Sequence, residues 1–304
     1  MQNSNEKLKE SIVKLKRERN AVILAHNYQR GEVQDIADFV GDSLGLSQTA
    51  AGTDAAVIVF CGVHFMAETA SILCPDKIVV LPDMNAGCPM ANMVTAEELR
   101  AMKREHPRAA VVCYINSTAE VKAESDVCCT SANALKVVES LDREEILFVP
   151  DKYLGHYVSM KTDKDLVFWP GYCPTHLKIL PKHITDLKQK YPSAKVIVHP
   201  ECRPDVVALA DEVLSTGGMC RYAMRQDVST MIVGTEIGIL HRLRKENPGK
   251  EFIPASGQAV CPNMKLITLE KVLSSLDEMK HQIKVPKKIR LKAKAAVDKM
   301  LKAV

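Results

Sequence analysis

Three Cys-Pro pairs recur at nearly equal spacing along this chain of 304 residues. Cys88, Cys173 and Cys261 lie 85 residues apart (88 to 173) and 88 residues apart (173 to 261). Thiolates are the usual ligands of iron–sulfur clusters, and three thiolates hold three irons of a 4Fe-4S cluster while the fourth iron stays open. An open metal position binds substrate oxygen atoms as a Lewis acid. The three cysteines are therefore the first candidates for chemistry.

Local spacing does not by itself join these cysteines. A structural zinc site needs a fourth protein ligand and usually draws on clustered patterns such as CxxC, which this chain lacks. Iron–sulfur proteins also commonly use clustered cysteines. Four other cysteines lie in or beside apolar runs and are interpreted as buried core thiols: Cys61, Cys113, Cys128 and Cys202. A shared site therefore depends on the elements that position the Cys-Pro pairs.

Those elements form a threefold repeat. Each repeat opens with an apolar run that predicts a buried strand and ends in polar residues, at 21–28, 110–117 and 195–202. A helical stretch and a small-hydroxyl turn follow, and the turns contain Ser43, Ser131 and Thr216. A second strand is predicted at 57–60, 146–149 and 231–233, before the run that leads to Cys-Pro. Amphipathic helices then follow at 95–106, 182–191 and 268–279, and a similar helix at 6–19 opens the first unit.

The repeat predicts an α/β fold of three small homologous domains in a pseudo-threefold arrangement around a central 4Fe-4S cluster. Each domain is expected to be a parallel sheet covered by helices. Any α/β protein alternates strands and helices, but Cys-Pro pairs and hydroxyl turns that recur in phase favour a true repeat. The predicted units are residues 1–90, 91–175 and 176–263, with C-terminal helices in 264–304 that pack on the first unit.

Polar side chains follow the first strand of every unit, where the carboxyl ends of parallel strands gather functional residues. They are His26, Tyr28, Tyr114, Asn116, His199 and Glu201. The hydroxyl turns lie next to predicted helix starts, where backbone N–H groups favour carboxylate or phosphate. Taken singly, such a serine is usually a helix cap and such a histidine is usually structural. Their shared phase with the cysteines instead favours one site for a small, anionic, oxygen-rich substrate.

Composition narrows the function classes. The formal net charge is only +4 and 5% of residues are aromatic, which argues against a nucleic-acid partner. No apolar run approaches the roughly 18 residues of a membrane span, and the polar N-terminal segment does not resemble a signal peptide. We therefore expect no membrane association and a reducing cytoplasm, where cysteines serve as metal ligands or core residues.

The motifs of this chain closely resemble the quinolinate synthase family of NAD biosynthesis. The segments that carry the resemblance run in family order from residue 24 to residue 265: LAHNYQ (24–29), QDIADFVGDSL (34–44), CPMAN (88–92), YINS (114–117), CTSAN (129–133), GYCPTH (171–176), VIVHPEC (196–202), STGGM (215–219), GTEIG (234–238) and CPNMK (261–265). One departure is the pair Cys128-Cys129, where the family has a single cysteine. Neither falls at the Cys-Pro phase, so both are interpreted as non-ligands.

The resemblance implies condensation of iminoaspartate with dihydroxyacetone phosphate to quinolinate, phosphate and two waters. It implies three homologous α/β domains around a 4Fe-4S cluster with one open iron, held by Cys88, Cys173 and Cys261. A transient contact with an L-aspartate oxidase or dehydrogenase is expected to supply the imine. The implied catalytic residues are Tyr28 and Glu201, which transfer protons, and His199, which assists them. The implied substrate-binding residues are His26, Ser43, Tyr114, Asn116, Ser131, His176, His199, Glu201 and Thr216.

Three other readings stay open at this point. A reductase that makes isoprenoid diphosphates would also hold a cluster through three cysteines, but it needs an electron donor and a diphosphate site. It also does not explain the motifs HNYQ and HPEC. A non-catalytic iron–sulfur sensor needs a DNA-binding or partner-binding segment, whereas the basic stretch 287–302 is interpreted as the solvated face of a helix. A mononuclear zinc hydrolase is the third.

Overall fold

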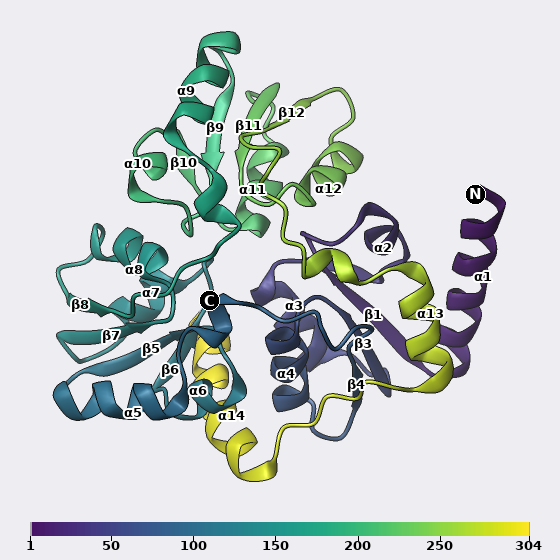
Figure 1. Cartoon of the computed structure of the whole chain (residues 1–304), viewed down its shortest axis with the longest axis horizontal. Coiled ribbons are helices and arrows are strands. Elements are labelled where there is room, and N and C mark those ends of the chain that lie inside the picture. Colours follow the sequence, from purple (N-terminus) through teal and green to yellow (C-terminus); the bar gives the residue numbers. More distant parts are fainter. Residues whose placement is uncertain (1, 304) are drawn as a thin grey trace.

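Three four-stranded parallel sheets form the framework of the protein in its computed structural model, which describes residues 2–303 and the side chains from residue 6 onward. The sheets have the strand orders β2-β1-β3-β4, β6-β5-β7-β8 and β10-β9-β11-β12. All of their strand pairs are parallel. The order is the same in each unit, which confirms the threefold α/β repeat. Figure 1 shows the sheets in three separate lobes.

The elements of each unit follow one another in the same sequence. The first unit contains α1 (Gln2–Glu18), β1 (Ala21–His26), α2 (Gly31–Ile36), β2 (Phe39–Gly41), α3 (Ser43–Gly52), β3 (Val57–Cys61), α4 (His64–Leu73), β4 (Ile78–Val80) and the 3-10 helix η1 (Met90–Asn92). The second contains α5 (Ala96–Glu105), β5 (Ala110–Tyr114), α6 (Ala119–Ala123), β6 (Val127–Cys129), α7 (Ala134–Glu139), β7 (Glu145–Val149), α8 (Lys152–Ser159), β8 (Asp165–Phe168) and η2 (His176–Lys178). The third contains α9 (Pro181–Lys190), β9 (Lys195–Val198), α10 (Pro204–Val207), β10 (Glu212–Val213), α11 (Thr216–Ala223), β11 (Thr230–Gly234), α12 (Ile239–Glu246), β12 (Glu251–Pro254) and η3 (Met264–Leu266). The chain ends with α13 (Leu269–Glu278) and α14 (Lys287–Lys302).

The central strands are buried because helices cover both faces of their sheets, so their sequences are continuous apolar runs. Strand β3 reads VIVFC and is buried along its whole length, as is β5. The four cysteines predicted to be core thiols are all buried. The first two units share one continuous hydrophobic core, whereas the third has a separate cluster on each side of its sheet.

Each sheet also has a short edge strand in a segment predicted to be only a turn: β2, β6 and β10. These strands have two or three residues and pair on one side only, with β1, β5 and β9. So few residues cannot display a periodic pattern, which explains why the sequence shows them only as turns. Their role is to bring the hydroxyl turn alongside the end of the first strand.

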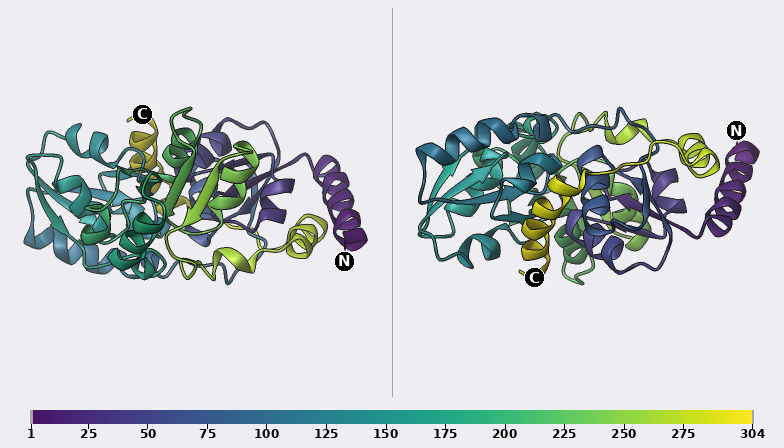
Figure 2. Two further views of the ribbon diagram at one scale, coloured as in Figure 1. Left: turned by 90° about the horizontal axis from the view of Figure 1, so that it is seen from above. Right: turned by 90° about the horizontal axis from the view of Figure 1, so that it is seen from below.

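The two C-terminal helices lie on different units. Helix α13 packs against α1, and Figure 2 shows the two together at one end of the molecule. Helix α14 instead packs mainly on α6 and β6 of the second unit, with a smaller contact to α4. Its buried face contains the small residues Ala293 and Ala296, which allow close approach to α6. The expectation that both helices pack on the first unit was therefore wrong for α14. The predicted boundaries of the three units, at 1–90, 91–175 and 176–263, remain a proposal.

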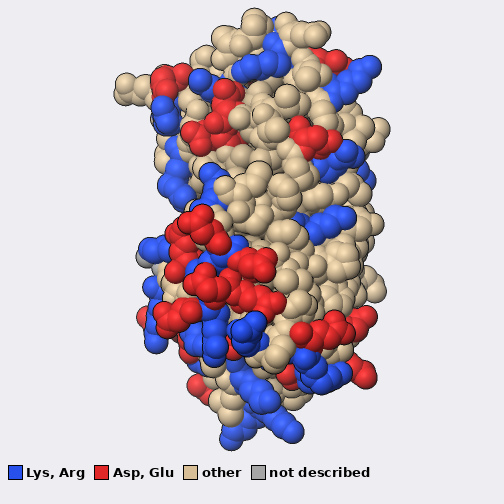
Figure 3. Space-filling view, turned by 90° about the vertical axis from the view of Figure 1, so that its left-hand side faces the viewer, with Lys and Arg blue, Asp and Glu red and all other residues tan. Residues whose placement is uncertain are grey.

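The outer surface carries both signs of charge. Figure 3 shows acidic and basic side chains interspersed on one face, with the largest group of acidic ones near its middle. That face has no extended basic surface of the kind that binds nucleic acid. Within residues 2–303 no helix is both long and apolar enough to cross a membrane.

Candidate functional site

One cavity lies where the three units meet. It is lined by every residue that the sequence predicted for the site: His26, Tyr28, Ser43, Cys88, Tyr114, Asn116, Ser131, Cys173, His176, His199, Glu201, Thr216 and Cys261. These residues come from the carboxyl ends of strands, from the loops before the 3-10 helices, and from the first residues of α3, α11 and η2. The carboxyl ends of the sheets therefore converge on one site, as the pseudo-threefold arrangement requires.

The three Cys-Pro cysteines have the same local structure. Each is a free, half-buried thiol that precedes a 3-10 helix. Backbone N–H groups lie near each sulfur and lower the pKa of its thiol: those of Met90 and Ala91 act on Cys88, that of His176 on Cys173, and those of Asn263 and Met264 on Cys261. Burial raises the pKa of the Cys88 thiol to about 12 and also raises the pKa of the other two, while the N–H groups oppose this rise. Such N–H groups stabilise a sulfur once a metal has displaced its proton.

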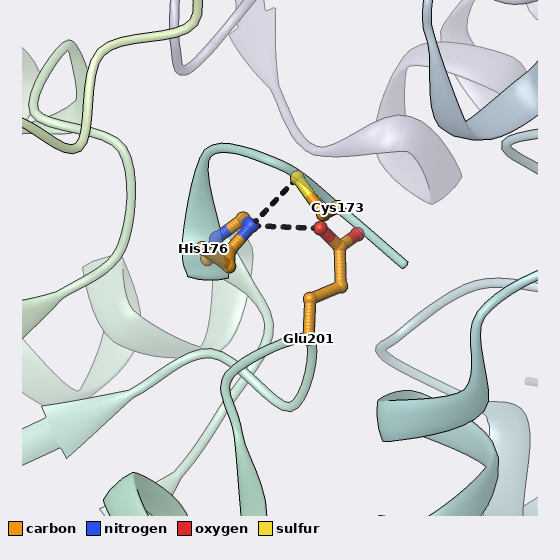
Figure 4. A group of neighbouring side chains, drawn as sticks. All are labelled: Cys173, His176 and Glu201. Carbon is orange, nitrogen blue, oxygen red and sulfur yellow. Dashed lines mark hydrogen bonds and ion pairs between the residues drawn. The ribbon is translucent and has the colours of Figure 1, made fainter. Parts of the chain in front are cut away.

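A tighter group of potential metal ligands surrounds Cys173. Atoms of Cys173, His176 and Glu201 all lie within 4.8 Å of one another. The ring of His176 contacts Glu201 at 2.8 Å and the Cys173 sulfur at 3.1 Å, and Figure 4 shows one ring nitrogen facing both. In the part of the chain that the structure describes, the three cysteines do not form a group this tight. A cluster occupies the space between its ligands, so wider separation of the sulfurs is compatible with a cluster and not with one shared ion.

Glu201 is a buried carboxylate with several hydrogen-bond donors. Tyr114 donates to its Oε1 at 2.5 Å, and Asn116 approaches the same oxygen at 3.4 Å. Burial opposes ionisation of Glu201, but its interactions with the His176 and His199 rings and the hydrogen bond from Tyr114 outweigh this effect, so its pKa lies below the ordinary range. Burial and the negative charge of Glu201 raise the pKa of Tyr114. Glu201 is therefore an ionised acceptor beside a neutral phenol.

Two buried histidines are held as neutral hydrogen-bond donors. Burial lowers the pKa of His26 to about 4 and that of His199 to about 3. In both rings Nδ1 accepts a backbone N–H, from Tyr28 at 3.2 Å and from Glu201 at 3.3 Å respectively. The hydrogen of each neutral ring therefore lies on Nε2. His199 uses it towards Ser131 at 3.1 Å.

Two helices begin beside the cavity. Ser43 and Thr216 are the first residues of α3 and α11, and the side chains that cap these helices belong to the preceding residues, Asp42 and Ser215. The hydroxyl groups of Ser43 and Thr216 are therefore not used as caps. The Thr216 hydroxyl accepts from Asn27 at 2.9 Å. Free N–H groups of a first helical turn favour anionic groups.

Sequence reasoning missed several residues around the site. Asp42 and Glu236 line the cavity, and Thr235 and Lys265 support it from behind. A usable signal existed for Glu236, which lies two residues after β11 just as the buried Asp151 lies two residues after β7. Lys265 gave no such signal, because a lysine near the end of a repeat reads as a surface residue.

Comparison with known proteins agrees with this geometry. The family model described as "Quinolinate synthetase A protein" matches residues 10–302. Quinolinate synthase from Dehalococcoides mccartyi (strain BAV1) is 63% identical over 299 residues, which covers 98% of this chain and 99% of that protein. The enzyme of the same name from Geotalea uraniireducens is 59% identical, with 97% of each chain covered, and that from Methanosarcina barkeri is 57% identical, with 96% of each covered.

A threefold repeat of parallel α/β units with a shared central site defines the class of protein. Within that class, the chain belongs to the quinolinate synthase family. Membership supports quinolinate synthase activity and a place in NAD biosynthesis, and the family implies an iron–sulfur cluster.

Proposed function

We propose that this chain condenses iminoaspartate with dihydroxyacetone phosphate to give quinolinate, phosphate and two waters. The observation that carries the proposal is the single cavity in which thiols, histidines, tyrosines and a carboxylate from all three units meet. The condensation forms a carbon–carbon bond and an imine and loses phosphate and water. It therefore needs anion binding, proton transfer and activation of a leaving hydroxyl, and the cavity contains groups suited to each.

The donor set fits a 4Fe-4S cluster held by Cys88, Cys173 and Cys261. All three are free thiols that face one cavity, and backbone N–H groups near each sulfur favour its thiolate form. When bound, such a cluster supplies an open iron that acts as a Lewis acid towards a substrate hydroxyl or carboxylate. The reaction involves no net oxidation or reduction, so the surrounding residues need only bind substrate and move protons.

Glu201 and Tyr28 are the proposed proton-transfer residues, with His199 in support. Glu201 is ionised and buried, which suits it to accept a proton from a substrate carbon or nitrogen. Burial and the negative charge of Glu201 raise the pKa of Tyr28, so Tyr28 acts as a neutral phenol. His199 is neutral, and its ring stacks on that of His176 at 4.8 Å.

The remaining cavity residues are proposed to bind the substrates. Carboxylate and phosphate groups fit the first turns of α3 and α11, where Ser43 and Thr216 add hydroxyl groups. The neutral rings of His26 and His199 offer donors without charge. The other proposed substrate-binding residues are Tyr114, Asn116, Ser131, His176 and Glu201.

Cellular context forms part of the proposal. All ten cysteines are free, and an oxygen-sensitive cluster needs a reducing environment, which supports a cytoplasmic location. Iminoaspartate is a reactive imine, so its supply by transient contact with an L-aspartate oxidase or dehydrogenase would limit its loss to water.

The test is purification without oxygen, measurement of iron and sulfide, and then addition of dihydroxyacetone phosphate and freshly made iminoaspartate. We expect about four irons and four sulfides per chain and formation of quinolinate. Cluster-loaded protein that forms no quinolinate from these substrates would overturn the proposal.

A single metal ion bound by Cys173, His176 and Glu201 is a second candidate, because these are the residues whose ligand atoms lie closest together. One cysteine, one histidine and one carboxylate with an open position suit zinc hydrolysis. That reading leaves Cys88 and Cys261 without a role. Zinc without sulfide in the purified protein would favour it.

A further inference from the structure

The net positive charge of the molecule is concentrated in helix α14. The helix contains seven basic residues and a single acidic one, Asp298, so its formal net charge is +6. The whole chain has a net charge of only +4, so the residues outside α14 together carry −2 (4 − 6). Asp298 is paired with Lys294 at 2.7 Å. Within the part of the chain that the structure describes, no other basic residue of α14 forms an ion pair.

Four exposed lysines of α14 form a stripe along one side of the helix, which we call the lysine stripe: Lys288, Lys292, Lys299 and Lys302. With the exposed Ala295 between them, they recur at intervals of four, three, four and three residues, which places all five on one helix face. At 1.5 Å per residue the stripe is about 21 Å long. In the view from below, Figure 2 shows α14 on the near side of the molecule.

The charge distribution of α14 is unfavourable for the helix itself. Lys288 and Lys292 lie four residues apart, and like charges at this spacing repel each other. Lys287 and Lys288 also lie in the first helical turn, where the helix dipole disfavours positive charge and no acidic residue is present. Helix α5 has the opposite order, with acidic residues in its first turn and basic residues in its last turn. Helix stability therefore does not explain the lysines of α14.

We propose that the lysine stripe is a docking surface for an acidic segment of a partner protein. A helix or strand that presents carboxylates along about 20 Å would neutralise the repulsion between the lysines when it binds. Lysine ammonium groups are flexible, strongly hydrated point charges, which suit a transient and salt-sensitive contact. The stripe lies outside the central cavity, so the inference goes beyond the proposed function and does not depend on it.

The surroundings of the lysine stripe favour a protein over a membrane or a nucleic acid. Lys299 donates to the backbone carbonyl of the exposed residue Asp126 at 2.9 Å, and α6, on which α14 packs, carries the exposed Glu120. A broad anionic surface such as a bilayer or a duplex would approach these carboxylates as well as the lysines, whereas a protein segment can place its charges on the stripe alone. The apolar face of α14 is buried and not free to enter lipid, and the stripe has no arginine or aromatic residue to contact bases.

The test measures binding of a fluorescent helical peptide to the full-length protein purified without oxygen. The peptide has glutamates at the spacing of the lysine stripe on an alanine background, and a second peptide of the same composition has its glutamates distributed around the helix. We expect the first peptide to bind more tightly by fluorescence anisotropy, with an affinity that falls as salt is added. Equal affinity for the two peptides would overturn the inference.

The triple variant Lys288→Gln/Lys292→Gln/Lys302→Gln removes charge from the stripe and keeps Lys299, which bonds to the second unit. We expect it to weaken binding of the first peptide about tenfold, as for the loss of three exposed ion pairs. Iron content and the rate of quinolinate formation should stay at the parental values, because the stripe lies outside the cavity.

The matched control is Lys7→Gln/Lys136→Gln/Lys182→Gln. It removes the same charge from exposed lysines of α1, α7 and α9, and we expect its affinity to stay within about twofold of the parent. Equal weakening in the control would show that net charge, and not the stripe, governs binding and would overturn the inference, as would parental affinity in the stripe variant. Vesicles of phosphatidylserine and phosphatidylcholine and a DNA duplex are tested in parallel. Binding of either that depends on the stripe, without such binding of the peptide, would also overturn it.

Discussion

Lys265 forms a 2.9 Å ion pair with Glu236 and also donates to the backbone carbonyl of Tyr28. Glu236 in turn accepts the backbone N–H of Cys261 at 3.1 Å. One buried ion pair therefore ties a proposed cluster ligand to a proposed proton-transfer residue, although the two lie at opposite ends of the chain.

Lys265→Met should destabilise the protein, because it leaves the fully buried carboxylate of Glu236 without its partner. The expected loss in the free energy of unfolding is about 2 kcal/mol or more. Urea unfolding of the single variant and of Lys265→Met/Glu236→Gln gives the measurement. The double variant should regain much of the loss, and equal instability of the two would contradict this explanation.

Replacing any one of Cys88, Cys173 and Cys261 with alanine should abolish the bound iron and sulfide, because each unit supplies one proposed ligand. Cys61→Ala and Cys74→Ala are the controls, since both thiols are buried away from the cavity. Iron and sulfide measured after purification without oxygen decide the outcome. A cluster retained in any of the three ligand variants would refute the assignment of that cysteine.

Gly171→Ala should disturb the Cys173 loop, because a Cβ at position 171 would lie 2.4 Å from the backbone oxygen of Pro150. Overpacking against rigid backbone costs about 1–3 kcal/mol. We expect a lower free energy of unfolding together with reduced iron content. Gly257→Ala has nothing within 4 Å of the new Cβ and lies close to Cys261, so it should retain both properties.

Tyr114→Phe should lower the rate of quinolinate formation by about 100-fold, because it removes the phenol that donates to Glu201. Steady-state rates are compared at equal iron content. Tyr191→Phe, at the end of α9 and outside the cavity, is the control. An unchanged rate in Tyr114→Phe would show that Glu201 acts without this donor.

Asp83→Asn should lower the free energy of unfolding by an amount that depends on pH. Burial opposes ionisation of Asp83, but Lys271 and the N–H of Asn85 outweigh it and lower its pKa below the ordinary 3.8. Its stabilisation is therefore complete above the pKa of the unfolded chain and is lost as pH falls through the lower folded pKa. We expect Asp83→Asn to lower the free energy of unfolding by about 1 kcal/mol near neutral pH, with a difference from the parent that shrinks as the pH falls below the ordinary 3.8. Urea unfolding across this range measures it, and a difference that did not depend on pH would contradict the charge-based explanation.

The repeat made much of this architecture predictable. Ser43, Ser131 and Thr216 recur in phase with the cysteines, and all of them do line one cavity. A shared position within the repeat predicts proximity in space, because equivalent positions of homologous units face the same axis, whatever the distance between them in sequence. The same correspondence between units applies to Glu236, because the equivalent position in the second unit is the buried Asp151.

Other contacts had no sequence signal, because they depend on how the units pack. The bond between Thr235 and Tyr28 joins residues that are far apart in the chain, and no local pattern pairs them. Helix α14 presents apolar residues on one face, which predicts burial but not the neighbour. The packing of α14 on α6 depends on how the two surfaces fit together, which the sequence does not show. The expectation that α14 packs on the first unit was therefore wrong.

The cavity lies where three lobes of one chain converge, and every lobe supplies only part of its wall. A change in the sequence of any one lobe therefore alters the site that all three lobes share. Because the three units belong to one polypeptide, corresponding positions can carry different side chains, and His26, Tyr114 and His199 stand at corresponding strand ends with different chemistry.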